Sequence, residues 1–429
     1  MPLNVLIVGA GVCGPALSAL LQGSDHRHNI TVVERSPSLR VAGQQIDLKA
    51  QGIPIMRKMS LLDTIKSHCV AESGMELVDS KGKPIAHFGV NDSDQGDLAM
   101  ALTSEYEIMR GDLVKVLYEA SLNQRAKLGK DLGKGGRLTY EFGKTITELT
   151  QSDDGVNVTF SDGQKRRYDI VVGADGQGSR TRRLAFGQEA SDEAFKSLGI
   201  HAAFYSIPRV EGEGEIAKAY IAQGRRGMMA RTGDRPVTQV YLFSMKNTER
   251  LKKFNKEPIE KQKEVWAETF KDAGWQSGRF LSGLNTCDDF YACQLAQVKM
   301  KQLYNGRVVL LGDAGYCPSV LTGMGTTASL IGSYVLAGEL ARHGNDVGMA
   351  LKAYERVVRP PVLEYQKMPF GGSLGIFWPS SRLGIWILRN TLWAISSFKI
   401  DQMIQRVLPR GKDKGGWTIP EYPELNLRS

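Results

Sequence analysis

The order of apolar and glycine-rich segments at the start of the chain predicts a strand, a helix and a second strand. Residues 4–8 are almost all apolar, which is typical of a central parallel strand buried on both faces. An Ala- and Leu-rich stretch that ends at residue 21 has the length of a helix, and residues 30–33 form a second apolar run. This order predicts the first βαβ unit of an α/β domain.

Two later apolar runs also end in turns that contain an acidic residue. Residues 168–173 precede Asp175, and residues 306–312 precede Asp313. A long apolar segment over residues 326–343 follows and predicts a buried helix. We expect the loops after these strands to converge on one ligand, although they lie far apart in the sequence.

The middle of the chain has the pattern of a different architecture. Residues 219–222 and 238–243 alternate in hydrophobicity, which predicts an antiparallel sheet with one face turned to a cavity. One amphipathic helix over residues 257–273 is expected to cover this sheet. Nearer the N-terminus, residues 53–69 predict a helix, and residues 74–88 predict a hairpin around a Ser-Lys-Gly-Lys turn.

These patterns divide the chain into two domains and a tail. A Rossmann-like nucleotide-binding domain is expected to be discontinuous and to comprise residues 1–75, 100–185 and 285–360. Its two insertions are expected to form a discontinuous antiparallel-sheet substrate domain from residues 76–99 and 186–284. A C-terminal helical tail follows at residues 361–429.

Composition is that of an ordinary globular protein. The 429 residues are 42% hydrophobic and 24% charged, and the basic residues behind the net charge of +9 are scattered, so no nucleic-acid partner is expected. The five cysteines fit neither a disulfide framework nor a zinc site, which favours reduced thiols in the cytoplasm. The apolar N-terminus lacks the basic residues of a signal peptide.

A glycine motif joins the first strand to the first helix. Gly9, Gly11 and Gly14 match G-x-G-x-x-G, whose glycines permit a tight turn, close approach to a pyrophosphate and packing of helix on strand. Glu34 ends the second strand about 20 residues later, where a carboxylate accepts hydrogen bonds from the ribose of an adenosine. Arg35 is expected to share this site. The spacing predicts a dinucleotide site that disfavours a 2′-phosphate.

The loop that begins at Asp313 has the chemistry of a flavin site. Asp313 suits ribityl hydroxyls, and Pro318, Gly323 and Gly325 let the backbone lie against an isoalloxazine ring. The helix that begins near Thr326 presents free N–H groups, and its positive end would stabilise the negative charge of a reduced flavin. The sequence therefore predicts FAD as the bound dinucleotide.

These motifs, in this order, resemble the single-component FAD-dependent monooxygenases of the para-hydroxybenzoate hydroxylase class. The resemblance covers residues 3–359. It is closer still to tetracycline-modifying and fungal secondary-metabolite flavin monooxygenases, whose flavin-adjacent segments match the sequence around Asp47 and Arg110. The resemblance implies that Asp47 and Arg110 contact FAD, and that Asp175 contacts both FAD and the transient reductant.

Some positions depart from the family pattern. Thr327 stands where Asn is frequent after the second glycine of the flavin loop, and Gly332-Ser333 replaces a later acidic residue. Both changes put the geometry of the loop in question rather than the binding of flavin. Cys317 has two interpretations, a small packing residue or a group for covalent or redox use.

The resemblance also implies a reaction. NAD(P)H reduces FAD, O2 adds to give a flavin C4a-hydroperoxide, and one oxygen atom passes to the substrate. We predict hydroxylation or epoxidation of a medium-sized aromatic or terpenoid-like small molecule in secondary-metabolite biosynthesis. Baeyer–Villiger oxygenation of a ketone and a non-catalytic dinucleotide-binding sensor are the alternatives. The reductant docks transiently in this class, so no second glycine motif is expected.

The second domain supplies candidates for substrate contact. No residue is assigned as a catalytic acid or base, and no metal site is expected. The substrate candidates, chosen by their strand spacing, are Tyr205, Tyr220, Met228, Arg231 and Tyr241. At such spacing they are also typical of a core, and Arg231 either orients an anionic or phenolic substrate or lies on the surface.

The tail combines tryptophans with arginines. Trp378, Trp386 and Trp393 alternate with leucine and isoleucine, and Arg382 and Arg389 interrupt the pattern. The segment is too charged and too often broken by glycine and proline to span a membrane. It predicts either a helix packed across both domains or an amphipathic helix that lies on a membrane surface. The oligomeric state is left open by the sequence.

Overall fold

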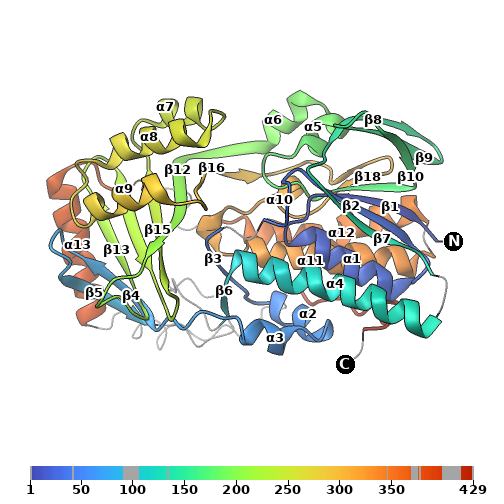
Figure 1. Ribbon diagram of the computed structural model, residues 1–429, viewed down its shortest axis with the longest axis horizontal. Helices are drawn as coiled ribbons and strands as arrows, with labels where there is room; N and C mark the ends of the chain where they lie inside the picture. Colours follow the sequence, from blue (N-terminus) through green and yellow to red (C-terminus); the bar gives the residue numbers. More distant parts are fainter. Residues whose placement is uncertain are drawn as a thin grey trace.

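The chain forms two domains that lie side by side (Figure 1). The computed structural model describes residues 2–40, 43–89, 106–132, 135–344, 346–368, 375, 378–398 and 417–427. Domain 1 is built on a six-stranded sheet and domain 2 on a seven-stranded sheet. This arrangement confirms the mixed α/β fold that the sequence predicts.

The sheet of domain 1 has the strand order β17-β18-β11-β1-β2-β7. Its strands are β1 (Asn4–Val8), β2 (Asn29–Glu34), β7 (Leu138–Phe142), β11 (Ile170–Gly173), β17 (Tyr304–Asn305) and β18 (Val308–Leu310). β1 pairs in parallel with β2 and β11, and β11 pairs in parallel with β18. The carboxyl ends of these strands therefore lie at one edge, where the three expected loops meet.

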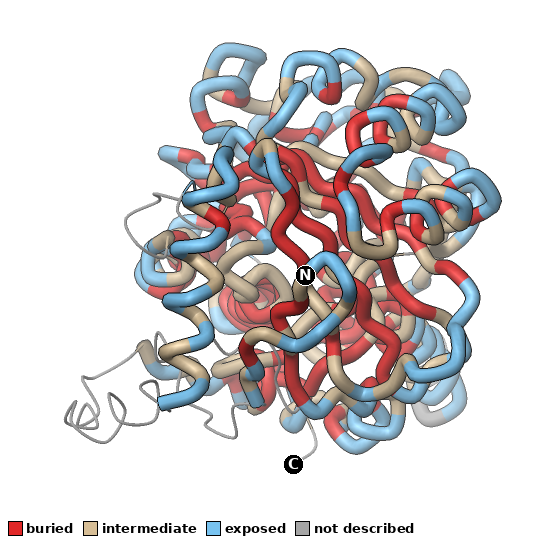
Figure 2. The backbone as a smooth tube through the Cα atoms, turned by 90° about the vertical axis from the view of Figure 1, so that its left-hand side faces the viewer, coloured by how far each residue is buried: buried red, intermediate tan, exposed pale blue. Residues whose placement is uncertain are grey.

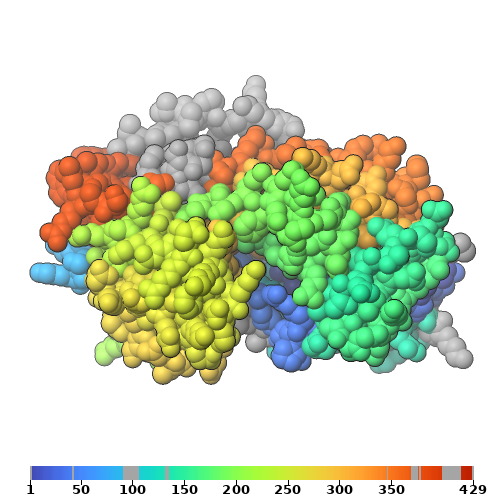
Figure 3. Space-filling view, turned by 90° about the horizontal axis from the view of Figure 1, so that it is seen from above, coloured from blue at the N-terminus to red at the C-terminus, as the bar shows by residue number. Residues whose placement is uncertain are grey.

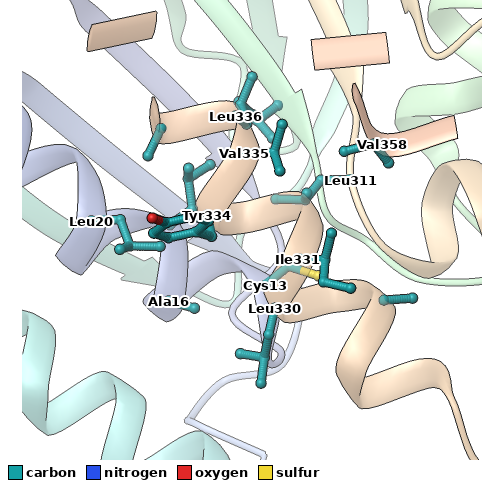
Figure 4. Packing of buried hydrophobic residues seen from close by; sticks show 14 of the residues in the cluster. Cys13, Ala16, Leu20, Leu311, Leu330, Ile331, Tyr334, Val335, Leu336 and Val358 are labelled. Carbon is teal, nitrogen blue, oxygen red and sulfur yellow. The ribbon is translucent and has the colours of Figure 1, made fainter. Parts of the chain in front are cut away.

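Helices and a small sheet cover the two faces of this sheet (Figure 1). On one face lie α1 (Cys13–Ser24), α4 (Arg110–Leu132), α11 (Gly325–Arg342) and α12 (Val347–Tyr365). On the other lie β8 (Ile146–Ser152), β9 (Gly155–Phe160), β10 (Lys165–Tyr168), α5 (Arg180–Phe186) and α6 (Gln188–Ala194). Helix α11 confirms the predicted helix over residues 326–343 and is buried along most of its length. Figure 4 shows Ala16 and Leu20 of α1 packed against Leu330 and Tyr334 of α11.

The sheet of domain 2 has the order β16-β12-β15-β14-β13-β4-β5. Its strands are β4 (Gly74–Val78), β5 (Pro84–Gly89), β12 (Phe195–Pro208), β13 (Ile216–Ala222), β14 (Arg226–Arg231), β15 (Val237–Ser244) and β16 (Tyr291–Val298). All neighbours are antiparallel except β13 and β4. The sheet thus extends to residue 298, beyond the predicted boundary at 284, because β16 pairs with β12 across a long separation in sequence.

Three helices cover the outer face of this sheet, where the sequence pattern predicted one. They are α7 (Thr248–Phe254), α8 (Ile259–Phe270) and α9 (Ser277–Thr286). The amphipathic pattern over residues 257–273 corresponds to α8, and the sequence analysis did not predict the shorter helices α7 and α9. Buried backbone runs through the interior of the molecule and exposed segments surround it (Figure 2).

Short elements connect the domains. A ribbon of β3 (Gln45–Asp47) and β6 (Glu107–Met109) is antiparallel, and α10 (Asp313–Tyr316) and η1 (Val320–Thr322) follow β18. The predicted helix over residues 53–69 is two helices, α2 (Gly52–Lys58) and α3 (Leu62–Lys66). The break occurs at Ser60, whose φ of 57° lies outside the helical region.

The described C-terminal segments contain helices, as predicted, and divide between the two domains. Helix α13 (Arg382–Ser397) lies along the edge strand β5. Residues 417–427, with the short helix η4 (Pro423–Leu425), return to domain 1. There the hydroxyl of Tyr422 donates to Glu339 of α11 (2.6 Å), and a Cβ atom at Gly338 would lie 2.3 Å from the Tyr422 ring. No described helix is both long and apolar enough to cross a bilayer.

Two buried histidines must remain neutral in this fold. Burial lowers the pKa of His28 to about 4, and Nδ1 of His28 accepts a hydrogen bond from the backbone N–H of Leu3 (2.9 Å). Burial also lowers the pKa of His201, on β12, to about 4. Among the described residues neither ring nitrogen of His201 has a hydrogen-bond partner. Protonation of either ring is therefore coupled to unfolding.

We expect His201→Leu to flatten the dependence of stability on pH. The folded-state pKa of His201 lies below the ordinary value near 6.5, so the unfolded state binds more protons as the pH falls. The wild type should lose about 2 kcal/mol through this residue between pH 7.5 and pH 5, a loss the variant avoids. Urea titrations of both proteins at the two pH values measure the difference. Parallel losses in the two proteins would contradict a buried neutral His201.

Candidate functional site

The glycine loop after β1 packs directly against the loop after β11. Gly9 has a φ of 113°, and a Cβ atom there would lie 2.4 Å from the carbonyl oxygen of Ala174. A Cβ atom at Gly14 would lie 2.1 Å from the carbonyl oxygen of Gly9. In contrast, a Cβ atom at Gly11 would approach only Nη2 of Arg110, at 3.5 Å. Gly9 and Gly14 thus allow close packing of the backbone. The backbone at Gly11 remains accessible, next to the guanidinium of Arg110.

The acidic residue at the end of β2 also reaches the glycine loop. Oε2 of Glu34 accepts a hydrogen bond from the N–H of Ala10 (2.9 Å), and Oε1 accepts one from the N–H of Ser36 (2.9 Å). The adjacent Arg35 is exposed. Glu34 is therefore fixed at the edge where its role as ribose acceptor was predicted, whereas Arg35 points to solvent.

Arg110 connects several of the predicted loops. Its Nη1 donates to the carbonyl oxygen of Arg40 (3.3 Å), and a Cβ atom at Gly43 would lie 2.9 Å from its Cδ. Burial lowers the pKa of Arg110 to about 10, and the nearby carboxylates of Glu34 and Asp313 partly oppose this shift. The guanidinium therefore stays protonated at neutral pH, next to the glycine loop. Such a group suits an anion that approaches Gly11.

The loop after β18 closes the site from the opposite side. A Cβ atom at Gly312 would lie 2.4 Å from Sγ of Cys13, so this loop touches the start of α1. Asp313 is half-buried, and burial raises the pKa of its carboxyl group. Its Oδ1 lies 4.0 Å from the Cβ position of Gly325, where α11 begins with N–H groups that have no acceptor within the helix. Asp313 and the start of α11 thus face the same space.

The turn before α11 is held against β3. Oδ2 of Asp47 lies 3.4 Å from the Cβ position of Gly323 and 2.8 Å from Nζ of Lys49. Oγ1 of Thr327 donates to the carbonyl oxygen of Lys49 (2.7 Å). Thr327, the residue that departs from the family pattern, therefore fixes the two flavin-adjacent loops to each other. Ser333, the second departure, donates to Ser329 within α11 (2.9 Å).

The residues after β11 form hydrogen bonds that hold the start of α5. The carboxylate of Asp175 accepts hydrogen bonds from the Ser179 hydroxyl (2.5 Å) and from the N–H groups of Arg180 (2.8 Å) and Thr181 (3.0 Å). Both oxygens lie at the start of α5, and Oδ1 accepts one of these hydrogen bonds while Oδ2 accepts the others, so the predicted contact of Asp175 with cofactor and reductant stays a prediction. Asp175 thus orients α5, which carries the next residue of interest.

Arg182, which the sequence reasoning missed, joins two motifs. It is buried on α5, and it donates to the carbonyl oxygens of Ala314 (2.7 Å) and Gln177 (2.9 Å). The loops after β11 and β18 are therefore bonded to each other through one guanidinium. The only signal in the sequence was a cluster of arginines after Ser179, which is equally typical of a surface.

The face of the domain 2 sheet that meets domain 1 is aromatic. Its apolar residues are Phe204, Met229, Tyr241, Phe243 and Tyr291, with Trp378 and Leu321 packed beside them. The rings of Phe204 and Tyr241 are 5.0 Å apart. The Tyr241 hydroxyl accepts a hydrogen bond from the N–H of Gln45 (2.9 Å), and the Arg40 guanidinium lies 4.9 Å from the Tyr291 ring. This face therefore meets the flavin-adjacent loop of domain 1.

Three residues that were predicted to contact substrate lie instead on the opposite face of the sheet, away from domain 1. Tyr205, Tyr220 and Met228 belong to the core beneath α8 and α9. The Tyr205 hydroxyl donates to the carbonyl oxygen of Phe280 in α9 (3.0 Å). Alternation identifies two faces but not their partners, and both faces of this sheet are apolar because helices cover one and domain 1 meets the other. Of the aromatic candidates only Tyr241 faces domain 1.

Arg231 lies on the domain 1 side, but its charge is already paired. It binds Glu72 (2.7 Å between Nη2 and Oε1) and Glu107, and all three side chains are buried. Burial raises the pKa of Glu107, whose Oε2 has no hydrogen-bond partner among the described residues. Arg231 is therefore neither a surface residue nor a free cation for a substrate. Two carboxyl groups share one guanidinium.

Comparison with known proteins identifies the family to which this site belongs. The model of the family described as FAD binding domain matches residues 2–362. The chain belongs to this FAD-binding family. The FAD-dependent monooxygenase asL6 of Sarocladium schorii is 44% identical over the full length of both chains. Monooxygenase CTB7 of Cercospora beticola is 32% identical over 98% of this chain and 97% of its own.

Solved structures agree with this membership. The crystal structure of tetracycline destructase Tet(51) superposes with a TM-score of 0.76 at 26% identity and covers 98% of this chain and 100% of its own. HpxO of Klebsiella pneumoniae, solved with FAD and uric acid, shares the fold with a TM-score of 0.65 at 19% identity over 94% and 97% of the two chains. The protein is an FAD-dependent monooxygenase, as the sequence motifs indicated.

The residues of this flavoprotein fit the cofactor. Accessible backbone at Gly11, the protonated Arg110 and the free N–H groups at the start of α11 suit an anionic dinucleotide. Cys317 donates to the carbonyl oxygen of Ala296 (3.7 Å), and burial raises the pKa of its thiol well above the ordinary range. A thiol that stays protonated is a poor nucleophile, which favours the packing interpretation of Cys317. The carbonyl oxygen of Pro318 accepts from Gln297 (3.1 Å).

We expect Arg110→Met to weaken FAD binding by about 10- to 100-fold, because a charge-assisted hydrogen bond is lost from the centre of the site. Isothermal titration of deflavinated protein with FAD measures the effect. Arg35→Met is the matched control, since Arg35 is exposed. Equally weakened FAD binding in both variants would contradict a specific role of Arg110. It would indicate that net charge matters or that Arg35 also contributes to the site.

Arg231→Leu should destabilise the protein more at pH 8 than at pH 5.5. Removal of the guanidinium leaves Glu72 and Glu107 buried without their cation, at a cost of about 3–5 kcal/mol when both are ionised. Without the cation, the pKa of Glu107, which burial already raises, rises further above its unfolded value, so protonation at lower pH restores part of the stability. Thermal denaturation at the two pH values tests this. A deficit that is independent of pH would mean that only packing is lost.

Proposed function

We propose that this protein uses NAD(P)H and O2 to hydroxylate or epoxidise an uncharged aromatic or terpenoid-like metabolite of medium size, in a secondary-metabolite pathway. The observation that carries the proposal is the placement of the aromatic face of domain 2 against the flavin-adjacent loop of domain 1. A flat apolar molecule held on this face would lie next to the flavin site. The similarity to the FAD-dependent monooxygenase asL6 and to monooxygenase CTB7, both from fungi, supports the pathway assignment.

The pairing of Arg231 supports a neutral substrate. Arg231 is neutralised by two carboxyl groups, so it offers no net positive charge to a carboxylate. The Tyr241 hydroxyl accepts from Gln45 and donates to Oε1 of Gln239 (3.0 Å), so it is also occupied. Recognition would therefore rest on apolar and ring contacts. The name of one structural neighbour refers to tetracycline, a compound with fused rings, which is consistent with this class.

The residues of the chain would bind and orient the reactants. When bound, reduced FAD supplies the activation of O2 that amino-acid side chains lack. Arg110 and the start of α11 would hold the anionic parts of the cofactor, and Asp313 would bind a hydroxyl group of its ribityl chain. Phe204, Phe243 and Tyr291 would exclude water from the substrate side. The free cysteines are consistent with a reducing compartment such as the cytoplasm.

A substrate screen tests the activity. Matched pairs of ring compounds, each a neutral molecule and its carboxylated analogue, are offered to the purified holoenzyme with NADPH or NADH. We expect a neutral member of some pair to accelerate reductant oxidation with an equal yield of oxygenated product. Structure determination of the product separates hydroxylation or epoxidation from Baeyer–Villiger insertion. Preference for the carboxylated members would overturn the proposed substrate class, and absence of coupled product from all of them would overturn the activity.

Adjacent residues of β12 provide a matched test of the substrate face. Phe204→Ala should raise KM about ten-fold with FAD content unchanged, because a buried aromatic contact with substrate is lost. Tyr205→Phe, one position along the strand but beneath α9, should leave KM unchanged. Steady-state kinetics with the substrate from the screen measure both. A larger effect at Tyr205 would place the substrate on the other face.

A further inference from the structure

Helix α13 has two apolar faces, and only one of them is packed. Ile385 is buried against Leu77, Ala86 and Ile221 of domain 2, with Leu388 and Leu392 beside it. The Ser396 hydroxyl donates to the carbonyl oxygen of His87 (2.9 Å) and accepts from its N–H (3.0 Å). These contacts fix the helix on β5 and determine which side chains point away from the protein.

The outward face carries large apolar side chains. Trp386 is 63% exposed and Trp393 is 49% exposed. The other exposed apolar residues of this face are Leu383, Ile387 and Phe398. Asn390, Thr391 and Ser397 lie among them and are also exposed, so the face is mixed rather than purely apolar. Figure 3 shows the segment at the outer end of domain 2, away from the centre of the molecule.

Positive charge predominates in and beside α13. Residues 382–398 contain two arginines and no acidic residue, and residues 382–414 contain seven Lys or Arg and two Asp. This stretch alone accounts for a net charge of +5 out of +9 for the whole chain. Lys81 and Lys83, in the turn between β4 and β5, are exposed on the hairpin that α13 covers. Among the described residues, Arg382, Lys81 and Lys83 therefore place positive charge near the exposed apolar face, and Asp79, in the same hairpin turn, interacts with Arg389.

We propose that the outward face of α13 binds the surface of a membrane that contains anionic lipids. Tryptophan and phenylalanine beside arginine, on a helix that itself carries no carboxylate, fit the boundary between head groups and acyl chains. The polar residues on the same face limit insertion to a shallow depth. Basic residues around the face add attraction to anionic head groups, and added salt weakens this attraction. A second copy of the chain is disfavoured as occupant because each copy would bring the same excess of positive charge.

Vesicle co-sedimentation of the full-length protein with its FAD bound tests this proposal without any substrate. The probes are phosphatidylcholine vesicles and vesicles of phosphatidylcholine and phosphatidylserine in a ratio of about 7:3. The wild type should bind the anionic vesicles, and the double variant Trp386→Ser, Trp393→Ser should bind them about ten-fold more weakly. Met349→Ser is the matched control, because Met349 is 54% exposed on α12 of domain 1. Flavin content and melting temperature confirm that each variant is folded.

Two further measurements separate the contributions. The double variant Lys81→Glu, Lys83→Glu should weaken binding to anionic vesicles and leave any binding to neutral vesicles unchanged. Brominated lipids should quench the tryptophan fluorescence of the wild type, and less so that of Trp386→Phe, Trp393→Phe. The proposal is overturned if the wild type binds neither vesicle, or if the tryptophan variant binds as well as the wild type. Light scattering that shows a dimer converted to a monomer by the tryptophan variant would assign the face to a second copy instead.

Discussion

Close approach of backbones at the carboxyl edge of the domain 1 sheet is the constraint on which the site depends. A side chain at Gly9 would collide with the carbonyl of Ala174, and one at Gly312 would collide with Cys13. These contacts bring the loops after β1, β11 and β18 together. In the chain, the loops after β11 and β18 follow the loop after β1 by about 160 and about 300 residues, respectively. In this arrangement Nη2 of Arg110 lies 3.5 Å from the Cβ position of Gly11.

The sequence predicted those parts of the structure that have a local signal. The strand over residues 4–8, the glycine spacing and the long apolar helix α11 depend on neighbouring residues alone, and the structure confirms them. The orientation of the domain 2 strands could not be predicted in this way. Tyr205 and Phe204 are equally compatible with either face, since the decision rests on helices and a domain that are distant in sequence. Asp175 and Arg182 show the same limit, because only the fold reveals which hydrogen bonds they form.

The domain 1 side and the domain 2 side of the site differ in charge, and this difference is consistent with different ligands on the two sides. On the domain 1 side Arg110 is buried and protonated beside open backbone, so an anionic cofactor gains from binding there. On the domain 2 side the one buried cation of the described aromatic face, Arg231, is matched by Glu72 and Glu107. A carboxylate placed there would meet a cluster with no positive charge to spare. The charge of Arg110 is therefore consistent with an anionic cofactor, and the pairing of Arg231 is consistent with the uncharged substrate that we propose.

The packing of α13 against domain 2 explains the apolar residues on its inward face but not those on its outward face. β5 is the last strand of the domain 2 sheet, and an uncovered edge strand invites pairing with other chains. Ile385 and Ser396 suffice to hold a helix over this edge. That structural role places no demand on the outward residues, which in a helix of purely protective function would be charged or polar. Trp386 and Trp393 face outward together in a stretch that has arginine but no acid, and coverage of the strand does not require this combination. Binding to a lipid surface, as we propose, accounts for this combination.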